Sequence, residues 1–325
     1  MIMKIGNVLS LFDGMSCGQI ALNRAGIEYD NYFASEIDKH AMKVTMANYP
    51  NTKQIGSVTE VKAEDLPKID LLIGGSPCQG FSFAGKQLNF DDPRSKLFFE
   101  YVRILKECKP KYFLLENVKM KKEYQDVISE MLGVQPIEIN SALVSAQNRK
   151  RLYWTNIPGV KQPEDRGVNL RHILQPNLGS CGIGGRIVGR RLNELGKRED
   201  YNKNIPIAQY LEIRKDQKSN CLTTVYKDSV VSYIKTDKRL KVKFRQEKAS
   251  CLTGGGNSGG NHSDMDILII DPNICRRYSP IECERLQTVP DNYTNHVSNT
   301  QRYKMLGNGW TVDVIAHIFK GIKTH

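Results

Sequence analysis

Cys78 occupies a segment that could place a reactive thiol at the edge of a sheet. It lies within residues 75–82 (GSPCQGFS), shortly after the short apolar run 70–73. Proline and glycine favour a loop there, whereas a buried structural cysteine more often lies within the strand itself. A thiolate is a strong nucleophile for a carbon that is only weakly electrophilic. The segment therefore predicts covalent catalysis by Cys78.

An acid and a basic run also lie next to apolar, strand-like runs further along the chain. Glu116-Asn117-Val118 comes directly after the apolar run 112–115, and residues 147–151 (QNRKR) precede the strand-like run 152–155. A carboxylic acid beside a thiol suits activation of a nitrogen heterocycle, because it can hydrogen-bond or protonate the ring during attack. Taken alone, the basic run is more typical of a solvated turn.

Residues 12–18 (FDGMSCG) form a glycine turn between an expected strand and an expected helix. Such a turn lets a ligand approach the backbone closely, but its spacing differs from the dinucleotide fingerprint, so NAD is disfavoured. Glu36 ends the second expected strand, where an acid can bind ribose hydroxyls; the alternative is a solvated surface carboxylate. Together the two features fit an adenosyl cofactor.

Strand-like and helix-like runs alternate over the first half of the chain, which predicts an α/β fold with a parallel sheet covered by helices on both faces. In such sheets ligands bind beyond the carboxyl ends of the strands, where Asp13, Cys78 and Glu116 all fall. The expected strands are residues 8–12, 32–35, 70–73, 112–115 and 152–155, and the expected helices are 18–25, 39–49 and 94–106.

The middle of the chain has a different composition. Residues 158–275 are glycine-rich and hold 20 Lys and Arg against 13 Asp and Glu, in a chain of net charge +12. This excess indicates a polyanionic partner, although charge alone fits a protein that is simply basic equally well. Short β-like runs at 222–226 and 267–270 predict a small, irregular, mostly β domain. The chain thus divides into 1–157, 158–275 and 276–325, the last forming helices at 280–287 and 311–322 that return to the first domain.

Together these motifs resemble the C5-cytosine DNA methyltransferase family, in family order and along nearly the whole chain. The compact length is similar to that of bacterial and phage members, whereas LSLFDGMSCG and LGNGWTVDVIAHIF resemble the catalytic domains of animal de novo enzymes. The matching pieces are residues 12–18, Glu36, 77–79 (PCQ), 85–104, 116–118 (ENV), Gln147 with Arg149 and Arg151, 277–290 (RYSPIECERLQTVP) and 306–312 (LGNGWTV).

The resemblance implies a Rossmann-like, S-adenosylmethionine-dependent domain and a smaller target-recognition domain at 158–275. Cys78 would attack C6 of a cytosine flipped out of duplex DNA, and Glu116 would contact N3 and the exocyclic amine. Arg149 would hold the thiolate and the base, supported by Gln147, Arg151 and Asn117. The cofactor, released as S-adenosylhomocysteine, would contact Phe12, Asp13, Gly14, Gly18, Glu36, Ile37, Ser57, Val58, Pro77, Leu97, Asn308 and Trp310. DNA would contact Gln79, Ser82, Lys86, Arg94, Thr253 and Gly255, within or beyond the closing loop 80–94.

Ser57 departs from the family pattern, which usually has an acid there to meet the adenine amine. Asp65 and Asp70 are nearby acids that could replace it. Two alternative functions stay open. A related subfamily methylates transfer RNA, although its Cys-Phe-Thr signature is absent and residues 221–223 (CLT) come nearest. A non-catalytic DNA-binding relative commonly loses the nucleophile or the acid, and this chain keeps both.

The eight cysteines include no pair with zinc-site spacing, so we expect no metal. Without an export signal, disulfides are not expected either, and most cysteines should be buried thiols. The chain has no run of about 18 apolar residues and no signal peptide, so no membrane partner is expected. We expect a monomer in the cytoplasm of a bacterial or phage-infected cell, compatible with a cognate restriction enzyme. The target DNA sequence does not follow from these residues.

Overall fold

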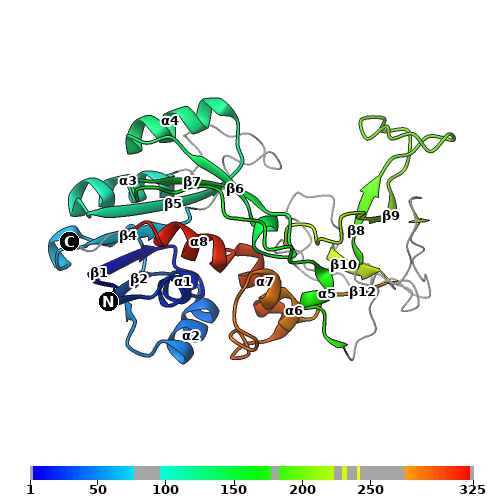
Figure 1. Ribbon diagram of the computed structural model, residues 1–325. Coiled ribbons are helices and arrows are strands. Elements are labelled where there is room, and N and C mark those ends of the chain that lie inside the picture. Colours follow the sequence, from blue (N-terminus) through cyan, green and yellow to red (C-terminus); the bar gives the residue numbers. More distant parts are fainter. Residues whose placement is uncertain are drawn as a thin grey trace.

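The computed structural model describes residues 3–76, 96–176, 183–222, 229–232, 240–241 and 275–322. The described strands form two separate sheets, which lie at opposite ends of the molecule in Figure 1. The first sheet contains β1 (Met3–Leu11), β2 (Ile27–Ser35), β3 (Lys53–Gln54), β4 (Leu71–Gly74), β5 (Tyr112–Val118), β6 (Ile137–Asn140) and β7 (Lys150–Thr155). The second contains β8 (Ile183–Arg190), β9 (Ala208–Ile213), β10 (Ser229–Ser232), β11 (Leu240–Lys241) and β12 (Cys275–Arg277).

The helices surround the first sheet and connect it to the second. They are α1 (Cys17–Ala25), α2 (Lys39–Asn48), α3 (Lys96–Cys108), α4 (Lys122–Leu132), α5 (Leu170–Ile173), α6 (Pro280–Leu286), α7 (Asn299–Asn308) and α8 (Val312–Phe319), with short 3-10 turns at Ala63–Asp65 and Ser141–Leu143. In the part of the chain that the structure describes, none of these helices is long and apolar enough to span a bilayer.

The order of the first sheet is β3-β2-β1-β4-β5-β7-β6. Its strands pair in parallel from β3 to β5, whereas β7 runs antiparallel to both of its neighbours, β5 and β6. The chain moves outward from β1 to β3 and then returns to β4 on the other side of β1. Such a switch in strand order opens a crevice at the carboxyl ends of the strands, where ligands bind.

Alternate residues of the strands supply two hydrophobic cores, one on each face of the sheet. Val8 and Ile73 belong to the core that contains α1 and α8, whereas their neighbours Leu9 and Leu72 belong to the core that contains α3 and α4. Accordingly, α3 and α4 lie toward the top of Figure 1 and α1 and α2 toward the bottom. Burial on both faces explains why the strands are continuous apolar runs.

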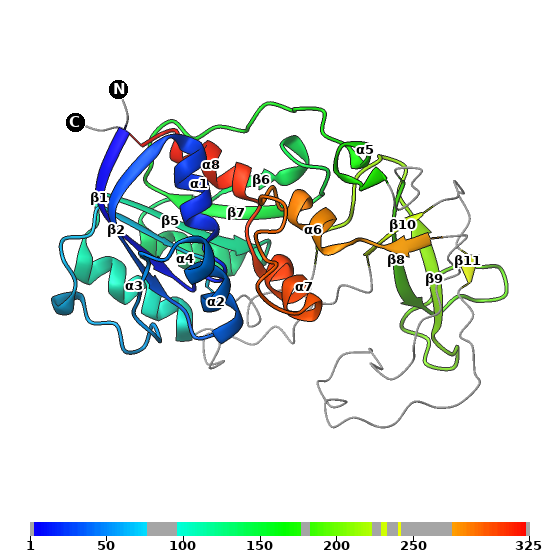
Figure 2. The same ribbon diagram turned by 90° about the horizontal axis from the view of Figure 1, so that it is seen from below.

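The second sheet is antiparallel, in the order β11-β9-β8-β10-β12. Its last strand, β12, spans the expected boundary at residues 275 and 276, and leads straight into α6. There Glu282 forms a capping box with Ser279 and an ion pair with Arg276 of β12, at 2.7 Å. Figure 2 shows α6 and α7 between the two sheets, so these helices lie where the two halves of the molecule meet.

Several elements differ from the expectation in length or direction. β1 and β2 begin earlier than expected because their first residues, although partly exposed, still pair across the sheet from Met3 and Ile27 onward. β5 continues through Glu116 to Val118, since these residues pair with β7. The expected parallel sheet is confirmed from β3 to β5, and β7 and β6 extend it with an antiparallel edge. Of the expected β-like runs at 222–226 and 267–270, only Leu222 is described, and it is not in a strand.

Candidate active site

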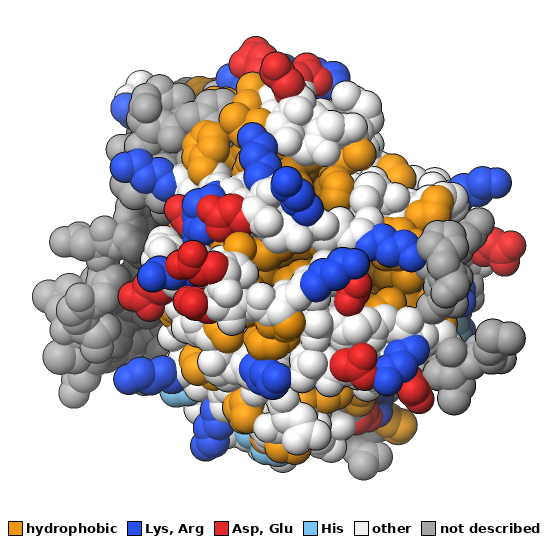
Figure 3. All heavy atoms as spheres, turned by 90° about the vertical axis from the view of Figure 1, so that its left-hand side faces the viewer, with side chains coloured by type: hydrophobic (Ala, Val, Ile, Leu, Met, Phe, Trp, Pro, Cys, Tyr) orange, Lys and Arg blue, Asp and Glu red, His pale blue; other side chains and the backbone are white. Residues whose placement is uncertain are grey.

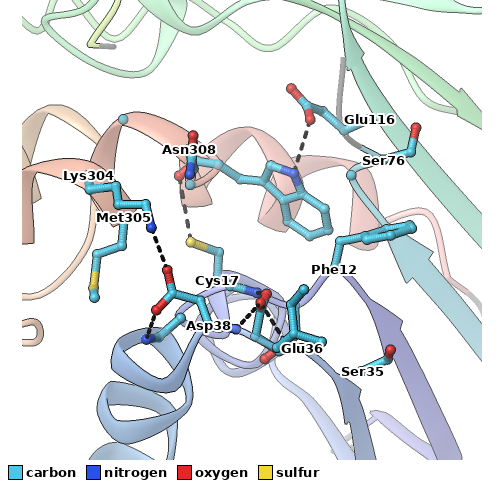
Figure 4. A pocket seen from close by; sticks show the side chains of 18 of the residues that line it. Phe12, Cys17, Ser35, Glu36, Asp38, Ser76, Glu116, Lys304, Met305 and Asn308 are labelled. Carbon is cyan, nitrogen blue, oxygen red and sulfur yellow. Dashed lines mark hydrogen bonds and ion pairs between the residues drawn. The ribbon is translucent and has the colours of Figure 1, made fainter. Parts of the chain in front are cut away.

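A cavity of about 440 Å³ opens at the carboxyl ends of β1, β2, β4 and β5 and is closed on another side by α7. Figure 4 shows Phe12 and Glu36 from the first two strand ends, Ser76 and Glu116 from the next two, and Met305 and Asn308 from α7. The expected cofactor residues that line this cavity are Phe12, Asp13, Gly14, Glu36, Ile37, Ser57, Val58, Leu97, Asn308 and Trp310. Gly18 is not among the lining residues. It packs α1 against the sheet, where a Cβ would lie 2.4 Å from Ile73.

The turn after β1 has an unusual backbone. Phe12, Gly14 and Ser16 have φ angles of 57°, 60° and 64°, in the left-handed region that L-residues rarely adopt. Phe12 and Ser16 thus hold a strained conformation, which is common where a loop is shaped for a ligand. This turn directs Asp13 inward, where the Tyr32 hydroxyl donates a hydrogen bond to its Oδ1 at 2.7 Å.

Asp13 is a buried carboxylate with an unused oxygen. Asp13 is one of the residues that line the cavity, and its buried Oδ2 has no hydrogen-bond partner among the described residues. Burial raises the pKa of this carboxyl to about 6, although hydrogen bonds from Ser10, Tyr32 and Ser16 oppose the shift. A buried, unpaired carboxylate oxygen is costly and fits a cationic ligand.

Glu36 is held rigidly at the end of β2. Its Oε2 accepts the Gly14 amide at 2.7 Å, and its Oε1 accepts the amides of Ile37 and Asp38 at 2.7 and 2.8 Å. The carboxylate therefore joins the ends of β1 and β2. A carboxylate offers about four lone-pair directions, so it retains capacity for a ligand hydroxyl.

Glu116 is oriented by two partners on opposite sides. Arg151 Nε lies 3.0 Å from its Oε1, and the Trp310 indole donates to its Oε2 at 3.2 Å, the dashed contact in Figure 4. Gly75 permits this arrangement, because a Cβ there would lie 2.9 Å from the indole nitrogen and 3.2 Å from Glu116 Oε2. The acid is thus fixed at the edge of the cavity.

Comparison with known proteins identifies the family to which this arrangement belongs. The family model described as C-5 cytosine-specific DNA methylase matches residues 6–324. The chain belongs to this methylase family.

Named relatives and solved structures agree with this assignment. The chain is 30% identical to the type II methyltransferase M1.ScrFI of Lactococcus lactis subsp. cremoris, over 95% of this chain and 75% of the relative. It is 28% identical to the type II methyltransferase M.FnuDI of Fusobacterium nucleatum, over 97% and 94% of the two chains. A crystal structure of a Spodoptera frugiperda DNMT2 mutant shares the fold, with a TM-score of 0.64, 19% identity and coverage of 98% of this chain and 99% of that one.

The expected catalytic residues Arg149, Gln147 and Arg151 differ in how close they lie to the cavity and to Glu116. Arg149 lines the cavity but is buried, and its guanidinium donates to the carbonyls of Leu222, Gly307 and Gly309 at 3.2, 3.3 and 3.0 Å. Gln147 is fully buried and does not line the cavity. Arg151 is therefore the arginine that meets the acid directly, and Arg149 lies behind it.

Asn117 holds the end of β4. Its amide nitrogen lies 3.2 Å from Ser76 Oγ and 3.5 Å from the Ser76 carbonyl. Ser76 directly precedes the segment that carries Cys78, so Asn117 anchors the start of that segment. The expected site residues Pro77, Cys78, Gln79, Ser82, Lys86, Arg94, Thr253 and Gly255 lie outside the described residues.

Neither Asp65 nor Asp70 takes the place of the missing acid at Ser57 in the cavity of the methylase. The Ser57 hydroxyl is 2.8 Å from that of Thr59, and neither Asp65 nor Asp70 lines the cavity. Asp70 instead accepts the amide of Asn7 at 2.9 Å, one residue before the start of β4 and so at the opposite end of the strands. Ser57 is thus the only one of these three that lines the cavity.

The cavity wall formed by α7 escaped the sequence-based prediction, apart from Asn308. Gln301, Lys304 and Met305 line it, and Lys304 forms an ion pair with Asp38 at 2.8 Å. Gln301, Lys304, Met305 and Asn308 recur at three- and four-residue spacing, the signal of one helix face. That face could have been read from the sequence once a helix was placed there.

Asp13→Asn should flatten the pH dependence of stability. The folded protein binds the Asp13 proton more tightly than the unfolded chain, whose pKa is near 3.8. The free energy of unfolding therefore falls as pH rises from about 4 to 6 and stays lower above pH 6. Two pKa units correspond to about 3 kcal/mol, so the variant should gain about 2–3 kcal/mol over the wild type between pH 4 and pH 8.

Urea unfolding at several pH values measures this difference. Asp126→Asn, at an exposed carboxylate of α4, is the control, since its side chain is 53% exposed. Parallel stability curves for the wild type and Asp13→Asn would contradict the prediction.

Proposed function

We propose that the chain transfers a methyl group from S-adenosylmethionine to C5 of a cytosine in duplex DNA. The observation that carries the proposal is a single cavity that joins the expected cofactor residues to Glu116 and Arg151. One end of the cavity offers the carboxylates of Asp13 and Glu36, and the other offers the Glu116 carboxylate beside Gly75, which follows β4. Because both groups of residues line one cavity, a methyl donor and the base that accepts the methyl group could lie next to each other.

The cavity fits the proposed cofactor on chemical grounds. When bound, S-adenosylmethionine supplies an electrophilic methyl group on a cationic sulfonium. Asp13 would attract that cation through its unpaired oxygen, and Glu36 would accept the ribose hydroxyls. Phe12 and Leu97 offer apolar surface, and α7 closes the opposite wall.

The reaction follows from the chemistry of the remaining residues. The Cys78 thiolate adds to C6 of the base while Glu116 hydrogen-bonds N3, which makes C5 nucleophilic. After C5 takes the methyl group, a base removes the C5 proton. The C5–H electron pair then reforms the C5–C6 double bond as the Sγ–C6 bond breaks. The cytosine must leave the duplex first, because C5 and C6 cannot be reached inside the base stack.

We propose that residues 158–275 recognise the target. The segment between β8 and β9 projects from the second sheet in Figure 1 and carries Leu195 and Tyr201, which are 92% and 100% exposed. Exposed large apolar side chains often mark a contact surface, and Lys197 and Lys203 add positive charge beside them. In contrast, Figure 3 shows Lys and Arg interspersed with Asp and Glu among the described side chains of one face. That face is not the expected DNA surface.

Bisulfite sequencing of DNA from cells that express the chain tests this function. Protection of cytosine at one recurring sequence is the expected result, and it would also reveal the target. Modification of transfer RNA in place of DNA would favour the RNA alternative. DNA binding without any modified cytosine would indicate that the chain is a non-catalytic DNA-binding relative. The type II names of the relatives suggest that the modification serves in a restriction-modification setting.

Glu36→Ala should weaken binding of S-adenosylmethionine by about 1.5–3 kcal/mol, the range for hydrogen bonds to a charged group. The variant also loses the acceptor for three backbone amides. Isothermal calorimetry on the DNA-free protein measures the affinity, and a thermal unfolding curve verifies that the variant is folded. Glu123→Ala, at an exposed acid in the first turn of α4, is the matched control. An unchanged affinity in folded Glu36→Ala would exclude Glu36 from the cofactor site.

A further inference from the structure

Cys221 places a sulfur atom between the two arginines of the active site. Its Sγ lies 3.1 Å from Nη1 of Arg149 and 3.7 Å from Nη2 of Arg151. The thiol is half-buried and is not one of the residues that line the cavity. The sulfur therefore contacts both arginines without lining the cavity itself.

Arg149 forms no ion pair with a carboxylate among the described residues, although the charge of Glu116 acts on it from a longer distance. Its remaining hydrogen bonds go to backbone carbonyls. A buried guanidinium without a counter-ion is costly, and a thiolate would offset that cost. Arg151 already pairs with Glu116, so the sulfur also meets the arginine that orients the acid.

Residues 218 and 219, which precede Cys221, bind the backbone of the segment that leads to Arg149 and Arg151. Ser219 pairs with Gln147 in a parallel bridge, and its amide and carbonyl bond Ala146 and Asn148 at 2.7 and 3.1 Å. Lys218 donates its ammonium to the carbonyls of Ala142 and Ser145 at 2.9 and 3.3 Å. The position of the sulfur is thus fixed by backbone contacts rather than by the arginines alone.

This docked segment follows β9 of the second sheet. Residues 216–222 leave β9 and run directly to the active-site arginines, so they connect the proposed recognition domain to the catalytic groups.

We propose that Cys221 is a positioning residue for the methyl transfer: its sulfur holds Arg149 and Arg151 in the orientation that fixes Glu116. The expected effect on kcat rests on the proposed function, whereas the expected acidity of the Cys221 thiol does not. Burial opposes ionisation of the Cys221 thiol, yet the two guanidiniums outweigh burial and hold its pKa below the ordinary value of a cysteine. The two guanidiniums thus favour the thiolate form of Cys221, although its thiol can also donate to the Leu222 carbonyl at 3.3 Å.

Alkylation tests this chemistry without requiring activity. In a Cys78→Ser protein, iodoacetamide forms a bond from Sγ to its methylene carbon and releases iodide, and mass spectrometry follows each cysteine. Cys221 should react with a pH midpoint below about 8.5, the ordinary thiol value. Cys108 is the internal control, because it is also half-buried but burial raises the pKa of its thiol. Arg149→Gln should move the Cys221 midpoint upward.

Kinetics test the positioning role. Cys221→Ala should lower kcat about tenfold or more, because misplaced catalytic groups lose much of their effect. The KM for the methyl donor should stay within about twofold, since Cys221 does not line the cavity. Cys221→Ser should recover part of kcat, because its hydroxyl still accepts the guanidinium hydrogen bonds. A merely structural role predicts the reverse order, with Ala tolerated better than Ser at a half-buried site. Cys108→Ala should leave kcat and KM unchanged.

Either of two results would overturn the proposal: a Cys221 midpoint equal to or above that of Cys108, or a wild-type kcat in Cys221→Ala. If the wild type methylates no cytosine, the proposed function fails, while the alkylation result still decides whether the sulfur is anionic.

Discussion

A duplex with 5-fluorocytosine at the target position should hold the protein in a complex that survives denaturing gel electrophoresis. Once Cys78 has added to C6 and C5 has been methylated, release requires loss of the substituent on C5 as a cation. A proton can leave in this way, but fluorine cannot, so elimination stalls with the Sγ–C6 bond intact. The complex should need S-adenosylmethionine, and no comparable band should form with an ordinary duplex.

Two variants separate the roles of the thiol and the acid. Cys78→Ser should abolish the band, because an alkoxide is far less available than a thiolate near neutral pH. Glu116→Gln should slow its formation without preventing DNA binding, since the acid activates the ring. Cys108→Ser is the matched control and should trap like the wild type. Normal methylation of ordinary DNA without trapping on the fluorinated site would rule out the covalent step assigned to Cys78.

Arg302→Met should destabilise the protein by about 3–5 kcal/mol, the usual cost of removing one partner of a buried ion pair. Arg302 Nη2 lies 3.0 Å from Glu284 Oε1, and the two side chains are only 7% and 0% exposed. The same carboxylate accepts the amides of Asn292 and Thr294 at 2.7 and 2.9 Å. Removing the arginine leaves the Glu284 charge buried without its counter-ion and breaks this link between α6 and α7.

Urea unfolding measures this loss by linear extrapolation. The double variant Glu284→Gln with Arg302→Met should recover part of the stability, because no uncompensated charge then remains. Lys122→Met removes an exposed pair with Asp126 and should change stability by less than about 1 kcal/mol. Because α7 lines the cavity, folded Arg302→Met should also bind S-adenosylmethionine more weakly. Equal stability of Arg302→Met and Lys122→Met would contradict the assigned role of this pair.

Much of the central fold could be predicted from local patterns. The strands β1, β4 and β5 are short apolar runs followed by turn residues, and a parallel sheet brings their carboxyl ends to one edge. Asp13 and Glu116 were therefore expected near each other although about a hundred positions separate them, and both line the same cavity. The antiparallel β7–β6 edge was not predicted, because the residues of a strand do not by themselves indicate whether it pairs in parallel or antiparallel.

The sequence by itself determined the class of fold, the family and which residue types stand at the strand ends, because those features depend on periodicity and on the order of motifs. The tertiary structure decided which of these side chains meet. It placed Arg151 rather than Arg149 on Glu116, and α7 across the cavity. It also brought Cys221 to both arginines across 70 and 72 positions of chain. No local pattern marks such a contact, because it arises only when residues 216–222 dock against 142–149. The charge state of the Cys221 thiol then depends on neighbours that only folding supplies.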